Sequence, residues 1–289
     1  MKENSLIGYC GIVAGFDTEF GMGMVNELNN YGVKVTSLGR ITEKNFWRRA
    51  PRRRGIEAVL NYTTCDFKSP GAIRNIVRGH MGYFGRLDFV VYGSSADFLC
   101  PLENMSQNGF SQALQTGVVG AFSLFQECLP FFRQTGGGRV IGLGHHMMKS
   151  HFQYAAQMAA SKTALYELIK SVAVEWGQYQ VTANMISPGP IETESGSLFR
   201  MTPGSQRKKM LRTSSPAGRF TSSKEVGGLI AYLLSPQARM ITGQNIVIDG
   251  GLSLNGVSTL PPEDRSSGDP RRHVVTADDV PLIDIEEEL

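Results

Sequence analysis

Short apolar stretches alternate with longer amphipathic stretches along most of this chain. The apolar stretches are rich in Val and Ile and only a few residues long, which is typical of strands buried on both faces. The stretches between them repeat apolar positions with helical spacing, and several begin after a serine that can accept a free N–H of the first turn. The expected strands are Ile7–Ala14, Val33–Leu38, Ala58–Tyr62, Leu87–Tyr92, Arg139–Leu143, Val181–Ile186 and Asn245–Ile248, and the expected helices are Gly21–Tyr31, Pro70–Tyr83, Ser106–Gln134, Tyr154–Gln178 and Lys224–Leu234.

This alternation of strands and helices predicts a single α/β domain on a doubly wound, seven-stranded parallel sheet. The predicted domain covers residues 1–256, and the remaining segment, 257–289, is rich in Pro, Ser, Asp and Glu. Such a segment has little apolar surface to offset the entropy lost on ordering, so we predict a disordered tail. A tail that docks on a partner or wraps a subunit is the alternative.

Composition narrows the functional class. The formal net charge of the 289 residues is +3, which is too small to indicate nucleic-acid binding. The first residues do not form a charged, apolar leader, and the apolar runs are too short to span a bilayer, so we expect a cytoplasmic protein with no membrane partner. The four cysteines lie far apart without metal-ligand spacing, which predicts buried, reduced thiols and no metal site.

A glycine-rich turn follows the first expected strand. Gly15, Gly21 and Gly23, with Met22 between the last two, lie where the next helix opens. Main-chain N–H groups and the helix dipole favour a pyrophosphate at such a place. The turn therefore indicates a dinucleotide site.

Five later segments make this indication specific. They follow or precede expected strands in a fixed order, and with the glycine-rich turn they resemble the short-chain dehydrogenase/reductase family over roughly residues 5–254. The resemblance implies a Rossmann-like fold and a nicotinamide dinucleotide cofactor. The segments are Leu38-Gly39-Arg40, Cys65-Asp66-Phe67, Gly85-Arg86-Leu87-Asp88, Ser187 to Thr193, and Thr242-Gly243-Gln244 through Asp249-Gly250-Gly251.

The resemblance also implies which residues contact the cofactor. In the family, the residue at the position of Arg40 faces the adenosine ribose, and an arginine there is similar to forms that hold the 2′-phosphate, so NADPH is expected rather than NADH. A solvated arginine is the alternative. Asp66 would bind the adenine amino group, while Ile191 and Thr193 would contact the nicotinamide carboxamide. The other positions placed at the cofactor are Phe67, Tyr92, Gly93, Lys162, Pro188 and Gly189.

The glycine-rich turn is two residues longer than the usual T-G-x-x-x-G-x-G of the family. It contains Asp17 and Glu19, which would repel a pyrophosphate if they pointed inward. A longer turn of this kind is similar to the enoyl-ACP reductase branch.

The family's usual Tyr-x-x-x-Lys pair is incomplete. Lys162 aligns with the lysine, whereas Met158 takes the tyrosine position, His145 the serine position and Gly117 the asparagine position. A thioether carries no acidic proton, so reduction of ordinary ketones by the family route is not expected. The resemblance implies that Lys162 still binds the nicotinamide ribose; a lysine that reaches solvent is the alternative.

Reduction of a conjugated thioester makes a different demand, because the enzyme stabilises an enolate and supplies its proton later. Ala173–Gly177 and Ala217–Phe220 look most like the dienoyl-CoA reductase branch. His145, expected at the mouth of the fifth strand, is one candidate donor, and a histidine paired with loop backbone is the alternative. Tyr154 would share a helix face with Met158 and is the second candidate, with packing as its alternative.

The sequence therefore predicts an NADPH-dependent reductase of a conjugated, apolar substrate that is CoA- or carrier-linked. A non-redox protein on the same scaffold, either a cyclase or isomerase or an inactive subunit, is the alternative. Residues 194–216 are the expected substrate lid, whose basic Arg207, Lys208 and Lys209 would meet a phosphate-bearing carrier arm or lie on a solvated helix. Continuous apolar character in Val118–Phe122 and Leu165–Val174 predicts a homo-oligomer, a dimer or tetramer.

Overall fold

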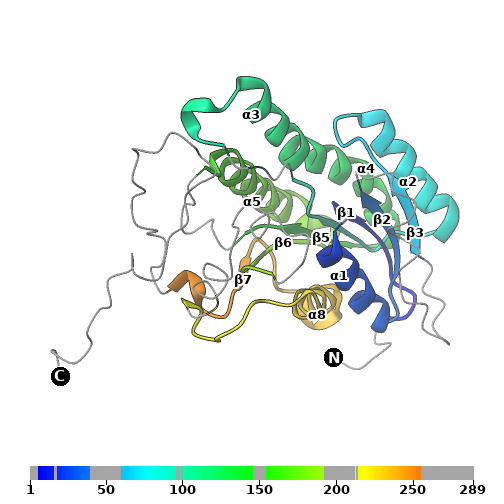
Figure 1. The fold of residues 1–289 in the computed structure, drawn as a ribbon. Coiled ribbons are helices and arrows are strands. Elements are labelled where there is room, and N and C mark those ends of the chain that lie inside the picture. Colours follow the sequence, from blue (N-terminus) through cyan, green and yellow to red (C-terminus); the bar gives the residue numbers. More distant parts are fainter. Residues whose placement is uncertain are drawn as a thin grey trace, which may run out of the picture.

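The computed structural model describes residues 6–15, 18–39, 60–95, 98, 100–145, 154–191, 212 and 214–254. These residues form one parallel sheet in the order β3-β2-β1-β4-β5-β6-β7, with helices on both faces, which confirms the predicted doubly wound α/β class (Figure 1). The strands are β1 (Cys10–Ala14), β2 (Lys34–Gly39), β3 (Leu60–Thr64), β4 (Phe89–Tyr92), β5 (Gly138–Leu143), β6 (Val181–Pro188) and β7 (Asn245–Ile248). The helices are α1 (Glu19–Asn30), α2 (Pro70–Phe84), α3 (Gln107–Leu114), α4 (Gly120–Thr135), α5 (Ala156–Trp176) and α8 (Ser223–Leu234), with a π-helical turn (Gln115–Val119) between α3 and α4.

The strand order places the topological switch point between β1 and β4. From β1 the chain winds outward through β2 to β3, then returns to pair β4 with the other side of β1 and continues outward to β7. Connections leave the sheet in opposite directions at this point. In open α/β sheets a ligand typically binds in the crevice outside the carboxyl ends of the strands at such a switch point, here β1 and β4.

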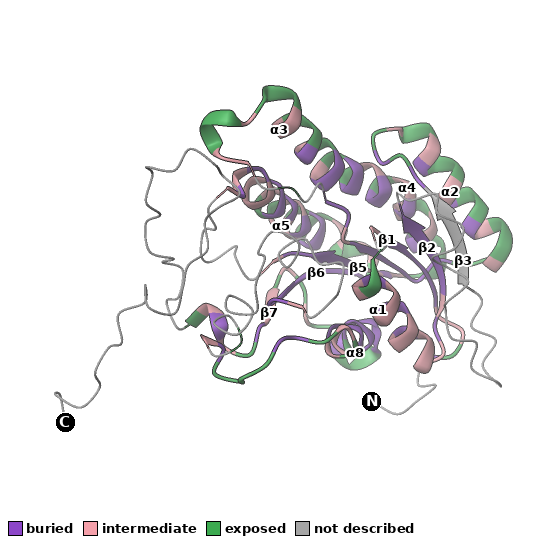
Figure 2. Ribbon diagram, in the orientation of Figure 1, coloured by how far each residue is buried: buried purple, intermediate pink, exposed green. Residues whose placement is uncertain are grey.

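Two buried layers hold the helices on the sheet. Val90 and Tyr92 of β4 belong to the layer under α2, α4 and α5, whereas Phe89 and Val91 belong to the layer under α1 and α8. This alternation follows from the two-residue period of a strand, and because both faces are covered the strand is apolar throughout. Figure 2 shows the helices turning their buried sides toward the sheet.

Several predicted boundaries differ from the observed ones by one to three residues, and three of the differences have a clear backbone reason. The first strand begins at Cys10 rather than Ile7, because Gly8 adopts a φ of 89° within a turn. The helix predicted over 106–134 is interrupted by the π-helical turn. The helix predicted from Tyr154 begins at Ala156, since Tyr154 has a left-handed φ of 65°.

Several predictions fall on residues outside the described part of the chain. They concern Arg40, Asp17 and Thr193, nearly all of the expected lid (194–216) and the tail (257–289). Of the cysteines, Cys10, Cys65 and Cys128 are buried and Cys100 is half-buried, and all four are free thiols. In the described residues, no helix has both the length and the apolar character needed to cross a bilayer.

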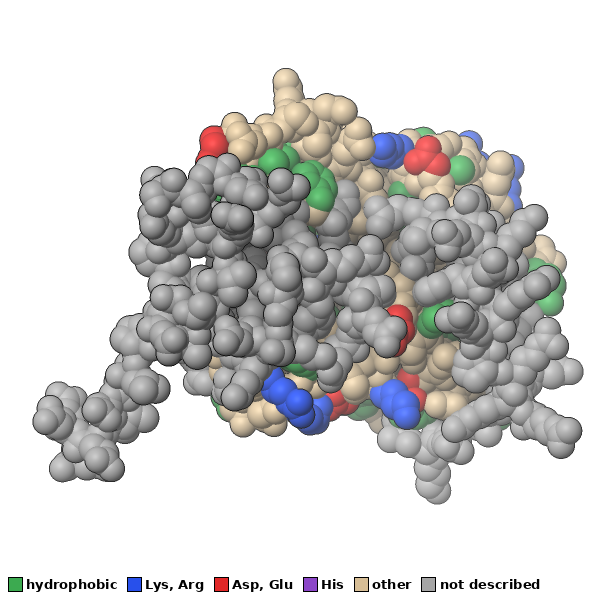
Figure 3. Space-filling view, viewed as in Figure 1, with side chains coloured by type: hydrophobic (Ala, Val, Ile, Leu, Met, Phe, Trp, Pro, Cys, Tyr) green, Lys and Arg blue, Asp and Glu red, His purple; other side chains and the backbone are tan. Residues whose placement is uncertain are grey.

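Helix α8 begins at a reciprocal cap that also carries an ion pair. The Ser222 hydroxyl accepts from the N–H of Glu225, whose carboxylate accepts from the N–H of Ser222 and from both ends of the Arg219 guanidinium (2.9 and 2.7 Å). Hydrogen bonds from Arg219 lower the pKa of Glu225 to about 2. On the face drawn in Figure 3, described basic side chains likewise lie near acidic ones. Helix α8 is thus anchored at its start.

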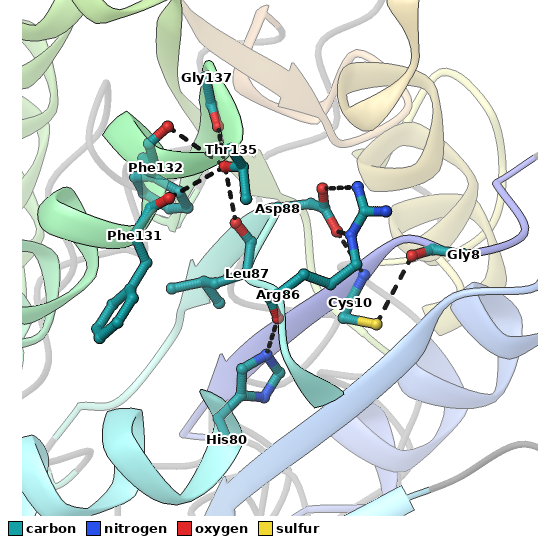
Figure 4. A network of polar contacts seen from close by, with 10 residues as sticks. All are labelled: Gly8, Cys10, His80, Arg86, Leu87, Asp88, Phe131, Phe132, Thr135 and Gly137. Carbon is teal, nitrogen blue, oxygen red and sulfur yellow. Dashed lines mark hydrogen bonds and ion pairs between the residues drawn. The ribbon is translucent and has the colours of Figure 1, made fainter. Parts of the chain in front are cut away.

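A polar network at the opposite, amino edge of the sheet ties strands together (Figure 4). The Asp88 carboxylate accepts from the main-chain N–H of Cys10 at 2.8 Å and from Arg86 at 2.9 and 2.5 Å. Beside it, His80 is fully buried between the Thr36 hydroxyl (2.8 Å) and the carbonyl of Arg86 (3.1 Å). A carbonyl can only accept, so Nε2 of His80 carries the proton and Nδ1 accepts from Thr36.

This histidine predicts acid sensitivity of the fold. Burial lowers the pKa of His80 from 6.5 to about 4, so the unfolded chain takes up the proton first as the pH falls. The stabilisation of the fold by neutral His80 is complete above the pKa of the unfolded chain and is lost as the pH falls from that pKa to the folded one. This loss lowers the free energy of unfolding by about 2–3 kcal/mol at about pH 4.5. Urea unfolding of the wild type and His80→Gln at neutral and acid pH measures it. An equal acid loss in both proteins would contradict the assignment.

Candidate active site

Gly15 shapes the switch point. Its N–H donates to the carbonyl of Leu38 on β2 (2.8 Å). On the other side of β1, the N–H of Gly93, just beyond β4, donates to the carbonyl of Ala14 (2.8 Å). Gly15 has a φ of 84°, and a Cβ there would overlap the main chain of Ser94 and lie 2.7 Å from the carbonyl carbon of Gly93. Only glycine leaves room at this crossing, where main chain can approach a pyrophosphate closely.

The start of α1 completes the glycine-rich turn. The Thr18 hydroxyl caps the helix by accepting from the N–H of Gly21 at 3.2 Å. Gly23 has a packing role, because a Cβ there would overlap the side chain of Ser223 on α8, with its Cβ at 2.8 Å. A cofactor contact at Gly21, Met22 or Gly23 stays a prediction. Glu19 is exposed in the first turn, on the solvent side.

Lys162 reaches the same edge from the buried face of α5. Its ammonium donates to the carbonyl of Leu143 at 2.9 Å and to that of Gly93 at 3.5 Å, and only 7% of the residue is exposed. These carbonyls lie at the ends of β5 and β4, so the charge is held beside the crevice. The structure thus brings together Gly15, Gly93 and Lys162, three of the predicted site residues.

The π-helical turn occupies the position of the family's asparagine. One hydroxyl donates to a carbonyl inside this turn, and a second donates to a carbonyl near the end of α3, just before it. Tyr92 donates to the carbonyl of Thr116, and Ser161 of α5 donates to that of Ala113 at 3.4 Å. A Cβ at Gly117 would overlap the Ser161 hydroxyl. Ser161 therefore fills the space that an asparagine side chain needs.

Restoring the asparagine should therefore damage this protein. We expect Gly117→Asn to lower the free energy of unfolding by about 1–3 kcal/mol, because overpacking forces the helices apart. Adding Ser161→Gly to Gly117→Asn should recover much of the loss. Denaturant unfolding of the two variants measures this, and a Gly117→Asn protein as stable as the wild type would refute the steric account.

The carboxyl end of β6 supplies the opposite wall of the crevice. The N–H of Gly189 donates to the carbonyl of Ile248 (3.0 Å), and Ile191 forms an isolated bridge to Thr221. A Cβ at Gly189 would lie 2.8 Å from the Cβ of Asp249, so this segment packs tightly on the end of β7. Pro188 and Gly189 are buried and Ile191 is half-buried, in the place the resemblance gives to the nicotinamide contacts.

The adenine side is only partly described. Asp66 is exposed just beyond β3, and its carboxylate accepts from the N–H of Lys68 at 3.0 Å. Phe67 and Tyr92 are buried and pack edge to face with ring centroids 5.5 Å apart. Any contact of these two residues with a cofactor must therefore use the main chain.

The two candidate proton donors differ in setting. His145 is half-buried two residues beyond β5, close in sequence to the Leu143 carbonyl that Lys162 binds. Tyr154 lies before α5 in the left-handed region, so the predicted shared helix face with Met158 was wrong. The carbonyl of Tyr154 accepts from the N–H of Cys100 at 2.8 Å, which joins the loop after β4 to the start of α5.

Sequence reasoning missed two side chains at this site. Ser161 was missed although Gly117, a position without a side chain, signalled that a neighbour fills the space. Gln157, fully buried in the first turn of α5, donates to the carbonyl of Phe98 and makes a second tie to the loop after β4. Among the described residues, no group of three or more His, Cys, Asp or Glu could hold a metal.

A doubly wound sheet whose chain crosses at a glycine and carries a buried lysine beside its switch point is the arrangement typical of dinucleotide-binding α/β proteins. The family model described as Enoyl-(Acyl carrier protein) reductase matches residues 17–253. The chain belongs to this family of short-chain dehydrogenases/reductases, which are NAD(P)(H)-dependent oxidoreductases.

Named relatives agree with this placement. The chain is 29% identical over 253 residues to the probable 2,4-dienoyl-CoA reductase of Bacillus subtilis, covering 84% of this chain and 96% of that protein. It is 28% identical over 197 residues to the peroxisomal 2,4-dienoyl-CoA reductase of Saccharomyces cerevisiae, covering 68% of this chain and 66% of that protein. The solved short-chain dehydrogenase/reductase of Serratia marcescens superposes with a TM-score of 0.75 at 28% identity, covering 86% and 99% of the two chains.

Proposed function

We propose that this protein uses NADPH to reduce a conjugated enoyl or dienoyl thioester carried by CoA or an acyl carrier. One observation carries the proposal: Lys162 is held at the switch point, while the residue one turn before it on α5 is Met158. The site keeps a group suited to the cofactor ribose but offers no phenol at the place that serves ketone reduction. Conjugated thioesters suit this arrangement, since their reduction needs no proton transfer in step with the hydride.

The chain's own groups would hold the cofactor at the carboxyl edge. When bound, the dinucleotide supplies a hydride to the electron-poor end of the conjugated system. Gly15 lets the main chain come close to the pyrophosphate. Lys162 binds the ribose, and the segment from Pro188 to Ile191 orients the nicotinamide.

Recognition of the 2′-phosphate by Arg40 would favour NADPH over NADH. Arg40→Ala should therefore weaken the binding of NADPH more than tenfold in a calorimetric titration and leave the binding of NADH unchanged.

Either His145 or Tyr154 would then stabilise the thioester oxygen and return a proton to carbon. The imidazole is the stronger candidate, because it lies two residues beyond the end of β5 and can both donate a hydrogen bond and transfer a proton. His145→Gln should therefore lower kcat, whereas Tyr154→Phe should not.

The remaining assignments concern partners. Val119 at the end of the π-helical turn, Phe122 of α4 and Val174 of α5 are exposed apolar side chains, which supports a homo-oligomer built on this part of the surface. Light scattering at micromolar concentration tests this, and a monomer would refute it. A carrier arm contacting Arg207–Lys209, the division into a domain and a tail, and a cytoplasmic location stay predictions.

A substrate panel tests the proposed reaction. The wild type receives NADPH with a 2,4-dienoyl-CoA, a 2-enoyl-CoA, a saturated acyl-CoA or an unconjugated ketone, and product mass is followed. We expect the conjugated thioesters alone to gain two hydrogens. Reduction of the ketone with no reaction of either conjugated thioester would overturn the proposal.

A further inference from the structure

We propose that Asp249 is a positioning residue for the nicotinamide half of the cofactor. Its carboxylate holds the turn after β7 in the shape that supports Gly189, within the segment that we propose orients the nicotinamide. The inference rests on the proposed function, because it needs a nicotinamide dinucleotide at the carboxyl edge of the sheet. Asp249 acts through the main chain of this segment and not by contact with the cofactor.

The Asp249 carboxylate organises the turn that follows β7. One of its oxygens accepts from the N–H of Gly251 at 2.9 Å, and the other accepts from the N–H of Ser253 at 2.8 Å. Only 7% of Asp249 is exposed. Gly250 and Gly251 have φ values of 65° and 85°, a backbone path that glycine follows at little cost. The buried carboxylate therefore fixes the path of a turn that is otherwise free to vary.

This turn packs directly on the segment assigned to the nicotinamide. A Cβ on Gly189 would lie 2.8 Å from both the Cα and the Cβ of Asp249, so no side chain separates the two segments. The N–H of Gly189 also donates to the carbonyl of Ile248, the residue before Asp249, at 3.0 Å. Because cores packed this closely transmit strain, a change in the turn is passed to Gly189.

A second segment contacts the same turn and ties it to the nicotinamide side. The Ser215 hydroxyl and the N–H of Ala217 both donate to the carbonyl of Gly250, at 3.2 and 3.1 Å. A few residues further on, the N–H of Thr221 donates to the carbonyl of Pro190 at 3.1 Å. The turn is thus a shared support for both segments, and its shape sets where the nicotinamide segment lies.

A second buried aspartate provides the matched control. Asp88 is 8% exposed, and its carboxylate likewise accepts from a main-chain N–H, that of Cys10 at 2.8 Å (Figure 4). It lies at the amino edge of the sheet, away from the proposed cofactor site. The general cost of losing a buried carboxylate should therefore appear at both positions, whereas an effect on the nicotinamide should appear only at Asp249.

The experiment compares Asp249→Ala, Asp249→Asn, Asp88→Ala and the wild type in the full chain. Calorimetry gives the Kd for NADPH and for 2′-phospho-ADP-ribose, which lacks only the nicotinamide ring. We expect Asp249→Ala to weaken NADPH about three- to tenfold and to leave the Kd of the shorter ligand unchanged. Asp249→Asn keeps one oxygen acceptor for the turn, so it should recover part of the loss. Asp88→Ala should bind both ligands as the wild type does.

Thermal unfolding without ligand supplies a second readout. Both alanine variants should melt about 2–8 °C below the wild type, because each leaves a main-chain N–H without its buried acceptor. Asp249→Asn should melt closer to the wild type, so its two Kd values decide the question if Asp249→Ala does not fold.

The possible failures are distinguishable. Equal NADPH affinity of the wild type and the folded Asp249 variants would overturn the inference while leaving the proposed function standing. An equal loss for both ligands would also overturn the inference, since that indicates general damage to the site. A wild type that binds no nicotinamide dinucleotide would overturn the proposed function, and the inference with it.

Discussion

Gly15→Ala should abolish binding of NADPH, raising its Kd more than a hundredfold, while the rest of the sheet still folds. The added Cβ would overlap the main chain of Ser94, and φ at this position is 84°. Backbone atoms cannot rotate aside as a side chain can, so β1 and β4 must separate at the crossing where we propose that the pyrophosphate binds. Calorimetric titration with NADPH measures the loss, and circular dichroism checks the fold.

Gly85→Ala is the matched control for backbone strain. Gly85 ends α2 with a φ of 71°, and a Cβ there would meet nothing within 4 Å. Alanine at this position should cost about 1 kcal/mol of stability through its φ alone and leave NADPH affinity unchanged. If both variants lost affinity alike, strain rather than the shape of the crossing would be responsible, and the assignment of Gly15 would fail.

Lys162→Met should weaken NADPH binding by about 10–100-fold, the range expected when a charged donor is lost from a buried site. Methionine has a similar length and is apolar, so it can take the place of the lysine side chain beside Leu143 and Gly93 without burying a charge. Lys162→Arg should also bind NADPH more weakly than the wild type, because the planar guanidinium does not fit a site built around a compact ammonium.

Lys170→Met on the same helix is the control for this prediction. The Lys170 ammonium pairs with Glu167 at 2.6 Å, and 42% of its side chain is exposed. An exposed pair of this kind contributes little, so neither stability nor NADPH affinity should change much. Wild-type affinity in both lysine variants would mean that Lys162 serves only the packing of α5 on the sheet.

The sequence predicted the sheet and its helices because apolar periodicity is a property of each segment by itself. It did not predict the π-helical turn, since the hydroxyls that bond the turn and the end of α3 before it come from Tyr92 on β4 and Ser161 on α5. The start of α5 was wrong for a similar reason. Periodicity extends through Tyr154, yet its φ of 65° accompanies a carbonyl bonded to Cys100, a contact between distant loops.

The candidate site was predictable where a motif fixes the main chain. Gly15, Gly93 and Lys162 come together as expected, because each lies at a strand end or on the helix that covers it. Gly23 shows the limit of motif transfer, since its space is taken by Ser223, which lies 200 residues further along the chain. The pairing of Ser161 with Gly117 and the contact of Asp249 with Gly189 depend on packing between elements, which no local pattern records.

We propose that this site transfers hydride from NADPH to a conjugated thioester although Met158 lies one turn before Lys162. The most direct test follows the nicotinamide absorbance after a 2,4-dienoyl-CoA is added to the wild type with NADPH, with a saturated acyl-CoA as the blank. We expect a loss of absorbance that depends on the dienoyl-CoA and matches the product formed. Tight NADPH binding without any such loss, for dienoyl and enoyl thioesters alike, would contradict it.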